Sequence, residues 1–409
     1  MYQVHGICQG AAGFLWSFGM SIELAGVHVE ARPVTQGPSH HFFGYYDKFP
    51  WDASGRWMLG LRTAFMDRPP QADDVAIVGV IDTENENKWT TLAETRAWNW
   101  QQGCMLQWLA GGPEIFFNDR IDGQFICHVL NVNTGHERII PRPIYTVNRS
   151  AKLGISLNFA RLHDQRPGYG YAGVPDPSLH RGEPEDDGLW AVDLESGKSR
   201  LILSLAEAAE FERQEDFLGK THRFNHVQFG ARDDRFSVLH RYKPEALNKV
   251  GETRLLTLNT DGTELCCLSQ DGYVSHYDWR GGASILAWAS EPGLGRKYYL
   301  FQDGAKRAEI IGAGVLTTDG HCSFSPDGRW VLTDTYPDTD NYRTLLLYHF
   351  ASGERVDIGR FFSPPVDWQI RCDLHPRWNR DGTQVCIDSV HEGARKMYVL
   401  DVASIVESR

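Results

Sequence analysis

The sequence contains no apolar run that approaches the roughly 18 residues a transmembrane helix needs. It also has no excess of basic residues: 41 Lys and Arg stand against 53 Asp and Glu, giving a formal net charge of −12. This balance argues against nucleic acid or an anionic membrane as a partner. No Lys or Arg precedes the short apolar patch near the N-terminus, so no signal peptide is indicated. Together these absences predict a cytoplasmic protein, with the periplasm as the alternative.

Cysteines are few, and none of them stands in a CxxC spacing. Of the eight, Cys127, Cys322 and Cys386 fall inside strand-like patterns. Small apolar thiols are common inside protein cores, whereas disulfides belong to oxidising compartments. We therefore expect buried free thiols in a reducing environment.

What the chain has in abundance is a repeated strand-turn-strand unit, seen most clearly in GHCSFSPDGRWVLTDTY, residues 320–336. Alternating apolar residues predict the strands, and Asp327-Gly328 supplies the positive φ that a tight hairpin needs. The same unit recurs at intervals of about 45 to 70 residues, a spacing typical of four-stranded propeller blades with variable loops. Its copies align on the residue before the turn: Phe49, Trp108, Phe159, Phe229, Trp279, Phe324 and Trp378.

The repeats therefore predict an all-β fold, a seven-bladed β-propeller over residues 21–409, with residues 1–20 as an N-terminal extension. The last blade has three obvious strands, so we expect the ring to close when an N-terminal strand within residues 22–34 supplies the fourth. Such closure removes an exposed sheet edge. Residues 161–188, rich in Pro, Gly and charge, interrupt blade three as a long insertion, a feature that is more often functional than accidental.

Four neighbouring repeats carry histidine three residues before the aligned aromatic. These residues are His226, His276, His321 and His375. Strand periodicity places this position on the face opposite the aromatic, and innermost strands line the channel, so the four imidazoles should converge. Nitrogen ligands favour Mn, Zn, Fe or Ni over Ca or Mg. The alternative interpretation is that the repeat simply favours a hydrogen-bonded histidine there.

Other polar residues are expected at the same mouth of the channel. The ends of the innermost and second strands contribute His40, His41, Asp119, Arg120, His222, Asn225, Arg241, Tyr336, Arg371, Asp373 and His391. The insertion adds Arg161, His163, Arg166, Tyr169 and Tyr171. A cleft in which titratable groups converge is a candidate active site.

Two resemblances follow from these motifs. SFSPDGRWVLTDTY resembles the repeat of the TolB-like propellers, which implies the fold alone. The segments NHVQF, FSVLHRYKP, VSHYDW and DGHCSFSPDG resemble the oligogalacturonate lyase family of seven-bladed polysaccharide lyases. That resemblance implies β-elimination of short uronic-acid oligosaccharides with a manganese-type ion held by histidines.

By position, the resemblance implies that His276 and His321 are metal ligands and that His226 is the catalytic histidine, with His375 completing the ligand set. Elimination requires a neutralised carboxylate, a base for the C5 proton and an acid for the departing C4 oxygen. We expect Arg161, with Arg241 as a further candidate, at the carboxylate. His226 would be the base or a fourth ligand, and Tyr171 or His41 the acid.

Two other classes of function remain open. A propeller with a structural metal could serve as a binding module. Whatever its function, we expect the protein to be a monomer or a homodimer. A glycoside hydrolase would need two carboxylates beside the scissile bond, for which Asp119, Asp334, Asp373 and Asp388 are available. Polyuronates other than galacturonate, such as ulvan or rhamnose-capped glucuronate, are alternative substrates.

Overall fold

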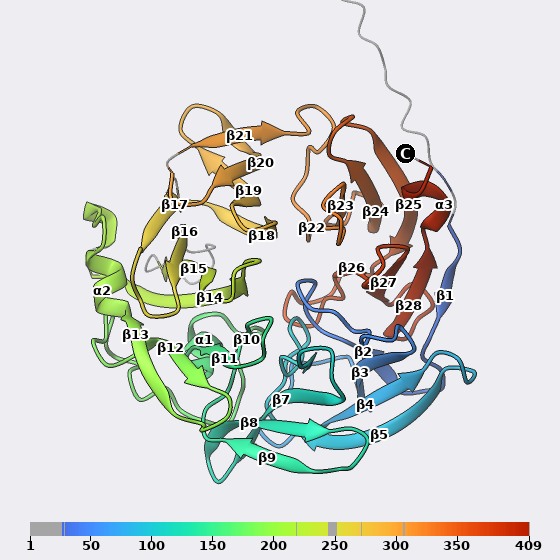
Figure 1. Ribbon diagram of the computed structural model, residues 1–409, viewed down its shortest axis with the longest axis horizontal. Coiled ribbons are helices and arrows are strands. Elements are labelled where there is room, and N and C mark those ends of the chain that lie inside the picture. The colour runs from blue at the N-terminus through green and yellow to red at the C-terminus, as the bar shows by residue number, and fades with distance from the viewer. Residues whose placement is uncertain are drawn as a thin grey trace, which may run out of the picture.

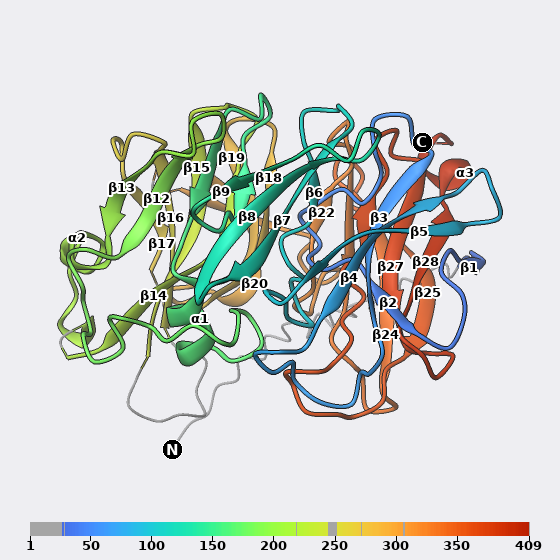
Figure 2. The ribbon, with the colours of Figure 1, turned by 90° about the horizontal axis from the view of Figure 1, so that it is seen from below.

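Seven four-stranded antiparallel sheets surround a central channel in the computed structural model (Figure 1). It describes residues 27, 29–217, 219–243, 252–270, 272–305 and 307–408, so the expected extension over residues 1–20 lies outside the described residues. Viewed from the side, the strands run between the two faces of the ring (Figure 2). The predicted seven-bladed propeller is confirmed.

Each blade is a meander from the channel outward. Blades one and two comprise β2 (His40–Phe42), β3 (Trp57–Thr63), β4 (Ala76–Asp82), β5 (Lys88–Thr95), β6 (Gln107–Trp108), β7 (Glu114–Ile121), β8 (Gln124–Asn131) and β9 (Glu137–Ile140). Blades three and four comprise β10 (Thr146–Val147), β11 (Leu153–Ser156), β12 (Gly188–Asp193), β13 (Ser199–Ser204), β14 (Thr221–Phe229), β15 (Arg235–Lys243), β16 (Glu252–Asn259) and β17 (Cys266–Ser269).

The second half of the ring follows the same plan. Blades five and six comprise β18 (Val274–Arg280), β19 (Ser284–Glu291), β20 (Gly295–Gln302), β21 (Ala308–Ile311), β22 (Ser323–Phe324), β23 (Trp330–Asp334), β24 (Tyr342–His349) and β25 (Arg355–Phe362). Blade seven comprises β26 (Arg377–Trp378), β27 (Gln384–Ser389), β28 (Lys396–Asp401) and β1 (Ala31–Pro33).

The outermost strand of blade seven comes from the other end of the chain. β1 pairs antiparallel with β28, with Ala31 opposite Leu400 and Pro33 opposite Tyr398. A hydrogen bond from the backbone N–H of Val34 to the carbonyl of Met397 extends the pairing. The two ends of the described chain thus share one sheet, which leaves β28 without a free edge.

Blade three differs from the sequence alignment. Its innermost strand is β10, so the position equivalent to the aligned aromatics is Val147 rather than Phe159. Phe159 instead begins helix α1 (Phe159–Gln165), which opens the insertion between β11 and β12. The alignment on Phe159 was wrong because Val147 breaks the aromatic pattern, and the next aromatic along the chain belongs to the inserted helix.

The blades pack through apolar side chains from facing sheets, and the turns and helices are short. Helices α2 (Leu205–Glu210) and α3 (Ala403–Val406) lie at the rim, and the seven cysteines in the described ranges are all free thiols, six of them buried. No helix within these ranges is long and apolar enough to cross a membrane.

Candidate metal centre and active site

Four histidines from blades four to seven meet in the channel. The ring centroids of His276 and His321 are 4.1 Å apart, and those of His321 and His375 are 4.4 Å apart. The ring of Tyr46 lies within 6.5 Å of both these pairs and of His226. All four imidazoles belong to residues that are at most 4% exposed. The structure therefore brings the predicted histidines into one buried cluster.

The histidine side chains point toward one another because the backbone around them is irregular, not because of regular strand alternation. The β14–β15 register shifts between Asn225 and Gln228, and the β18–β19 register shifts between Val274 and Tyr277. His226 and His375 have positive φ angles of 50° and 41°. Such conformations cost a non-glycine residue about 1–3 kcal/mol and, like bulges, gather at functional sites.

His321 presents an unprotonated nitrogen. Its Nδ1–H donates to Asp334 Oδ1 at 2.8 Å, and its backbone N–H donates to the same oxygen at 2.7 Å. This contact fixes the tautomer and leaves a lone pair on Nε2. Within the described residues, Nε2 of His321 and Nε2 of His375 are buried without a hydrogen-bond partner.

Both orphaned nitrogens face the carboxylate of Asp373, with Nε2–Oδ2 distances of 4.0 Å from His321 and 3.9 Å from His375. Ligand atoms of the three residues all lie within 4.8 Å of one another. Two imidazoles and a carboxylate, with one imidazole oriented by a second carboxylate, form a donor set that suits a divalent transition metal. The residues present therefore fit a metal ion.

Arginines keep Asp373 ionised. Arg343 Nη2 donates to its Oδ1 at 2.6 Å, and Arg371 Nε donates to its Oδ2 at 2.7 Å. Burial alone would raise the pKa of Asp373, but Arg343 and Arg371 hold that pKa well below its usual value. Asp373 is thus a permanently anionic residue at the centre of the site.

His276 is oriented like His321. Its Nδ1 lies 3.0 Å from Asp319 Oδ1, which leaves Nε2 as its ligand nitrogen. Burial and the neighbouring His321 lower the pKa values of His276 and His375. Neutral imidazoles are the form that binds a metal.

His226 differs from the other three because a tyrosine occupies one of its nitrogens. The Tyr46 hydroxyl donates to Tyr277 O and accepts from Tyr277 N, each at 2.9 Å, and lies 3.4 Å from His226 Nε2. Since the hydroxyl proton is already used, His226 Nε2 is the donor, and the lone pair lies on Nδ1, which has no partner among the described residues. Burial and His276 lower the pKa of His226 well below its ordinary value, so this base is neutral.

Tyr45 supplies a protonated hydroxyl between two histidines. Its ring centroid lies 5.0 Å from that of His226 and 5.1 Å from that of His375. Burial and Tyr169 raise the pKa of Tyr45 well above its ordinary value. The hydroxyl therefore stays protonated and is a candidate proton donor.

Arginines without a carboxylate partner adjoin this cluster. Arg223 and Arg241 lie opposite each other on β14 and β15, so like charges face each other across the pair. Arg223 is 3% exposed, and within the described ranges its Nε and Nη1 have no hydrogen-bond partner. Burial and Arg241 lower the pKa of Arg223 well below its ordinary value. A buried guanidinium that lacks a counter-ion indicates a place for an anionic ligand.

Arg161, by contrast, forms its ion pair and hydrogen bonds with other residues of the protein. It pairs with Asp176 at 3.2 Å and donates to the carbonyls of His222, Ser178, Arg181 and Gly182. These bonds hold the insertion against β14, and they leave the guanidinium no geometry free for a substrate.

Tyr171 and His41 also lie apart from the four histidines. Tyr171 stacks on Phe159 with ring centroids 4.4 Å apart, and its hydroxyl accepts from Asn118 Nδ2 at 3.0 Å. His41 packs edge-on to Trp89 at 5.0 Å. The insertion reaches the site through Tyr169 instead, whose hydroxyl accepts from Arg371 Nη2 at 3.2 Å.

Sequence reasoning did not select Asp373 as a metal ligand or Asp334 as the partner of His321, and it did not name Arg223 or Tyr45 as site residues. Asp373 stands two residues before His375, and Arg223 three before His226, so local spacing offered a signal for both. Asp334 is the exception, because it is brought to His321 only by the β22–β23 hairpin.

Two solved oligogalacturonate lyases are similar over most of the chain. The enzyme from Vibrio parahaemolyticus has a TM-score of 0.62 and 14% identity, covering 91% of this chain and 94% of that one. A second, solved in complex with manganese, has a TM-score of 0.66 and 16% identity, covering 91% and 93%.

A propeller from a different class of protein is also similar. The β-propeller domain of the Trilobed protease from Pyrococcus furiosus has a TM-score of 0.50 and 12% identity, covering 85% of this chain and 90% of that one. No family model and no curated protein sequence matches the chain. At such low identity the similarity concerns architecture: the chain has the seven-bladed propeller fold that is found in oligogalacturonate lyases.

Proposed function

We propose that this protein is a polysaccharide lyase that cleaves a uronic-acid-containing glycan by metal-assisted β-elimination. The observation that carries the proposal is the pairing of two features in one channel. Buried imidazole nitrogens without partners surround Asp373, and beside them stand guanidinium groups without counter-ions. The first feature suits a cation and the second suits a carboxylate, and a uronate bound to a metal ion satisfies both.

The metal ligands in this proposal are Nε2 of His276, His321 and His375 together with Asp373. Manganese is the proposed ion, because the similar lyase structure contains it, with Zn, Fe or Ni as alternatives. When bound, a divalent cation draws electron density from the substrate carboxylate and makes the neighbouring C5–H more acidic.

Arg241 and Arg223 receive the substrate carboxylate. Their positive charges oppose each other in the free protein, and an anion between them removes that repulsion as it binds. The contribution grows as negative charge builds up on the carboxylate in the transition state. Arg161, which is committed to Asp176, is replaced in this role by Arg223.

Proton transfer falls to His226 and Tyr45. Nδ1 of His226 accepts the C5 proton, and the Tyr45 hydroxyl donates its proton to the oxygen that leaves C4. The C4–O bond breaks as the C4–C5 double bond forms, so one proton is taken up and one is given. The stacking of His226 on Tyr277, at 4.2 Å between centroids, holds the base in place during this exchange.

The proposed elimination can be tested by the ultraviolet absorbance of its product as well as by the rate of cleavage. The manganese-loaded protein is incubated with oligogalacturonate, ulvan and a neutral glucan, and the ultraviolet absorbance of the conjugated C4–C5 alkene is followed. We expect absorbance to rise with one uronate and to disappear in His226→Gln but not in His136→Gln, at an exposed position. New reducing ends without absorbance would identify a hydrolase, and binding without either product would identify a binding module.

A further inference from the structure

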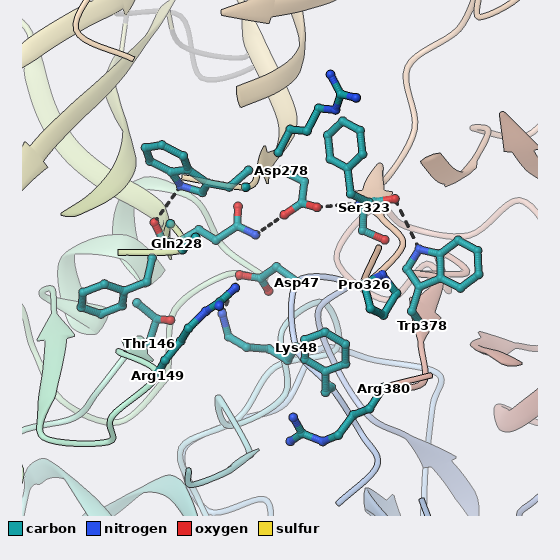
Figure 3. Close-up of a pocket in the computed structure, with 18 of the residues that line it drawn as sticks. Asp47, Lys48, Thr146, Arg149, Gln228, Asp278, Ser323, Pro326, Trp378 and Arg380 are labelled. Atoms are coloured by element: carbon teal, nitrogen blue, oxygen red, sulfur yellow. Dashed lines mark hydrogen bonds and ion pairs between the residues drawn. The ribbon is translucent and has the colours of Figure 1, made fainter. Parts of the chain in front are cut away.

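The hairpin turns that follow the innermost strands surround a cavity of about 1000 Å³, here called the hairpin-face cavity. It is formed by the final residues of the innermost strands and the turns that follow them, including Gln228, Asp278 and Ser323 (Figure 3). Gln107 lines it as well. Asp47 and Lys48, which follow Tyr46, also line it. None of the histidine ligands does.

The cavity presents hydrogen-bond acceptors that have no donor. Asp47 Oδ1, Gln228 Oε1 and Ser323 Oγ are buried and unpartnered within the described part of the chain. The side chain of Asp47 is 0% exposed, and Gln228 and Ser323 are each 9% exposed. Gln228 and Asp278 are fixed in position, because Gln228 Nε2 donates to Asp278 Oδ1 at 2.5 Å and the backbone N–H of Phe324 donates to Oδ2 at 2.7 Å.

Unpaired acceptors could be satisfied by a cation or by hydroxyl groups, and the neighbouring charges decide between them. Lys48 Nζ already binds Asp47 Oδ2 at 2.5 Å, so a cation on Oδ1 would sit beside an ammonium group on the same carboxylate. Arg149 and Arg380 also line the cavity and add to the repulsion. Neutral hydroxyl groups donate to the acceptors without this repulsion, and their oxygens can accept from Lys48 and Arg149.

The cavity also offers an aromatic face. Phe49 is 43% exposed at its rim, with the Arg380 guanidinium 5.5 Å from the ring centre. A flat apolar ring beside several convergent polar groups is a common arrangement in small-molecule sites. A sugar ring has the matching chemistry, since it carries hydroxyl groups around its edge and C–H groups on its face.

From these contacts we propose that the hairpin-face cavity binds a saccharide unit, whose hydroxyl groups donate to Asp47, Gln228 and Ser323. No histidine of the cluster lines this cavity, and the proposal does not depend on the lyase activity proposed above.

The matched test uses two glutamines at the same repeat position in different blades. Gln228 has a buried Oε1 without a partner, whereas Gln107, which lines the same cavity, is half-buried and has no buried unpartnered atom. Binding of methyl glucoside and of galacturonate to the full-length protein is measured by saturation-transfer NMR and calorimetry. We expect Gln228→Met to weaken binding about tenfold, the size expected for a lost buried hydrogen bond, and Gln107→Met to change it by less than about twofold. Ser323→Ala serves as a second, smaller change with the same expected direction.

The outcomes distinguish a saccharide site in this cavity from binding at the histidine cluster and from a cation site. Binding should persist in His276→Ala, because His276 does not line the hairpin-face cavity. Loss of binding in that variant, equal loss in both glutamine variants, or no binding of either sugar would overturn the proposal. Calcium binding that Gln228→Met abolishes, in place of sugar binding, would overturn it in favour of a cation site.

Discussion

Asp334 acts on the proposed metal through another residue, since its contacts are with His321 Nδ1 and backbone N–H. Replacing Asp334 with Asn removes the charge that fixes the His321 tautomer. We predict a loss of metal affinity of about 10- to 100-fold, as is typical of partners that orient a ligand. Elemental analysis and chelator competition measure it, with the exposed Asp340→Asn as control.

Two buried arginines, Arg161 and Arg223, should respond in opposite ways to the same substitution. Arg161→Met leaves Asp176 buried without its partner and should lower the free energy of unfolding by about 3–5 kcal/mol. Arg223→Met removes an unpaired charge and should leave stability unchanged or higher, while raising KM for the uronate substrate. Chemical denaturation and steady-state kinetics measure the two effects. A strongly destabilised Arg223→Met would show that this arginine is structural.

Acid should destabilise the fold through His222, which stacks on His240 with ring centroids 5.0 Å apart. Burial, with Arg254 and Arg161 nearby, lowers the pKa of His222 to about 4 from its ordinary value of 6.5. Between those two values the unfolded chain binds a proton that the folded chain does not, so stability falls as the pH is lowered. We expect a loss of up to about 1.4 kcal/mol per pH unit from this group. Unfolding measured from pH 7 to pH 4 should show a shallower slope in His222→Phe.

At the scale of elements, the insertion depends on a close backbone approach at Gly170. A Cβ there would lie 2.2 Å from Phe159 O and 2.2 Å from His163 N, both backbone atoms of α1. Gly170→Ala should therefore displace the segment that carries Tyr169 and lower stability by about 2 kcal/mol or more. Thermal unfolding and limited proteolysis within residues 161–188 report on it.

Gly112 provides a control for the Gly170→Ala substitution. At Gly112 an added Cβ would meet one atom, Leu109 O, at an ordinary 3.7 Å. Gly112→Ala should behave like the wild type, and equal behaviour of the two variants would contradict the role given to Gly170.

Element-level prediction succeeded where the repeat was regular. Asp327-Gly328 and five of the aligned aromatics located innermost strands, because tight turns and alternating apolar residues leave local signals. In blade one, Phe49 lies beyond β2, which ends at Phe42. The prediction of the innermost strand of blade three failed, because Val147 provides no such signal.

The site was predictable only in part, for a related reason. The histidines could be predicted because they occupy the same position in four repeats, and equivalent repeat positions lie at the same depth in the channel. The contacts of Arg161 with Asp176 and of Tyr171 with Phe159 depend on how the insertion folds back, which no local pattern encodes.

At the scale of the whole molecule, the ring is held shut by the short pairing of β1 with β28. Deleting residues 1–34 should expose the edge of β28, lower the midpoint of thermal unfolding and promote self-association. Deleting only residues 1–20 should leave both properties unchanged. Calorimetry and size-exclusion chromatography make the comparison, and a harmless longer deletion would show that blade seven is stable with three strands.

Tyr46 reaches from blade one to blade five, where its hydroxyl is bonded to both backbone groups of Tyr277. Its ring borders the histidines, and the same residue lines the hairpin-face cavity. It thus connects the histidine cluster to the hairpin-face cavity through a single residue. Replacing Tyr46 would therefore disturb the histidines and the cavity at the same time.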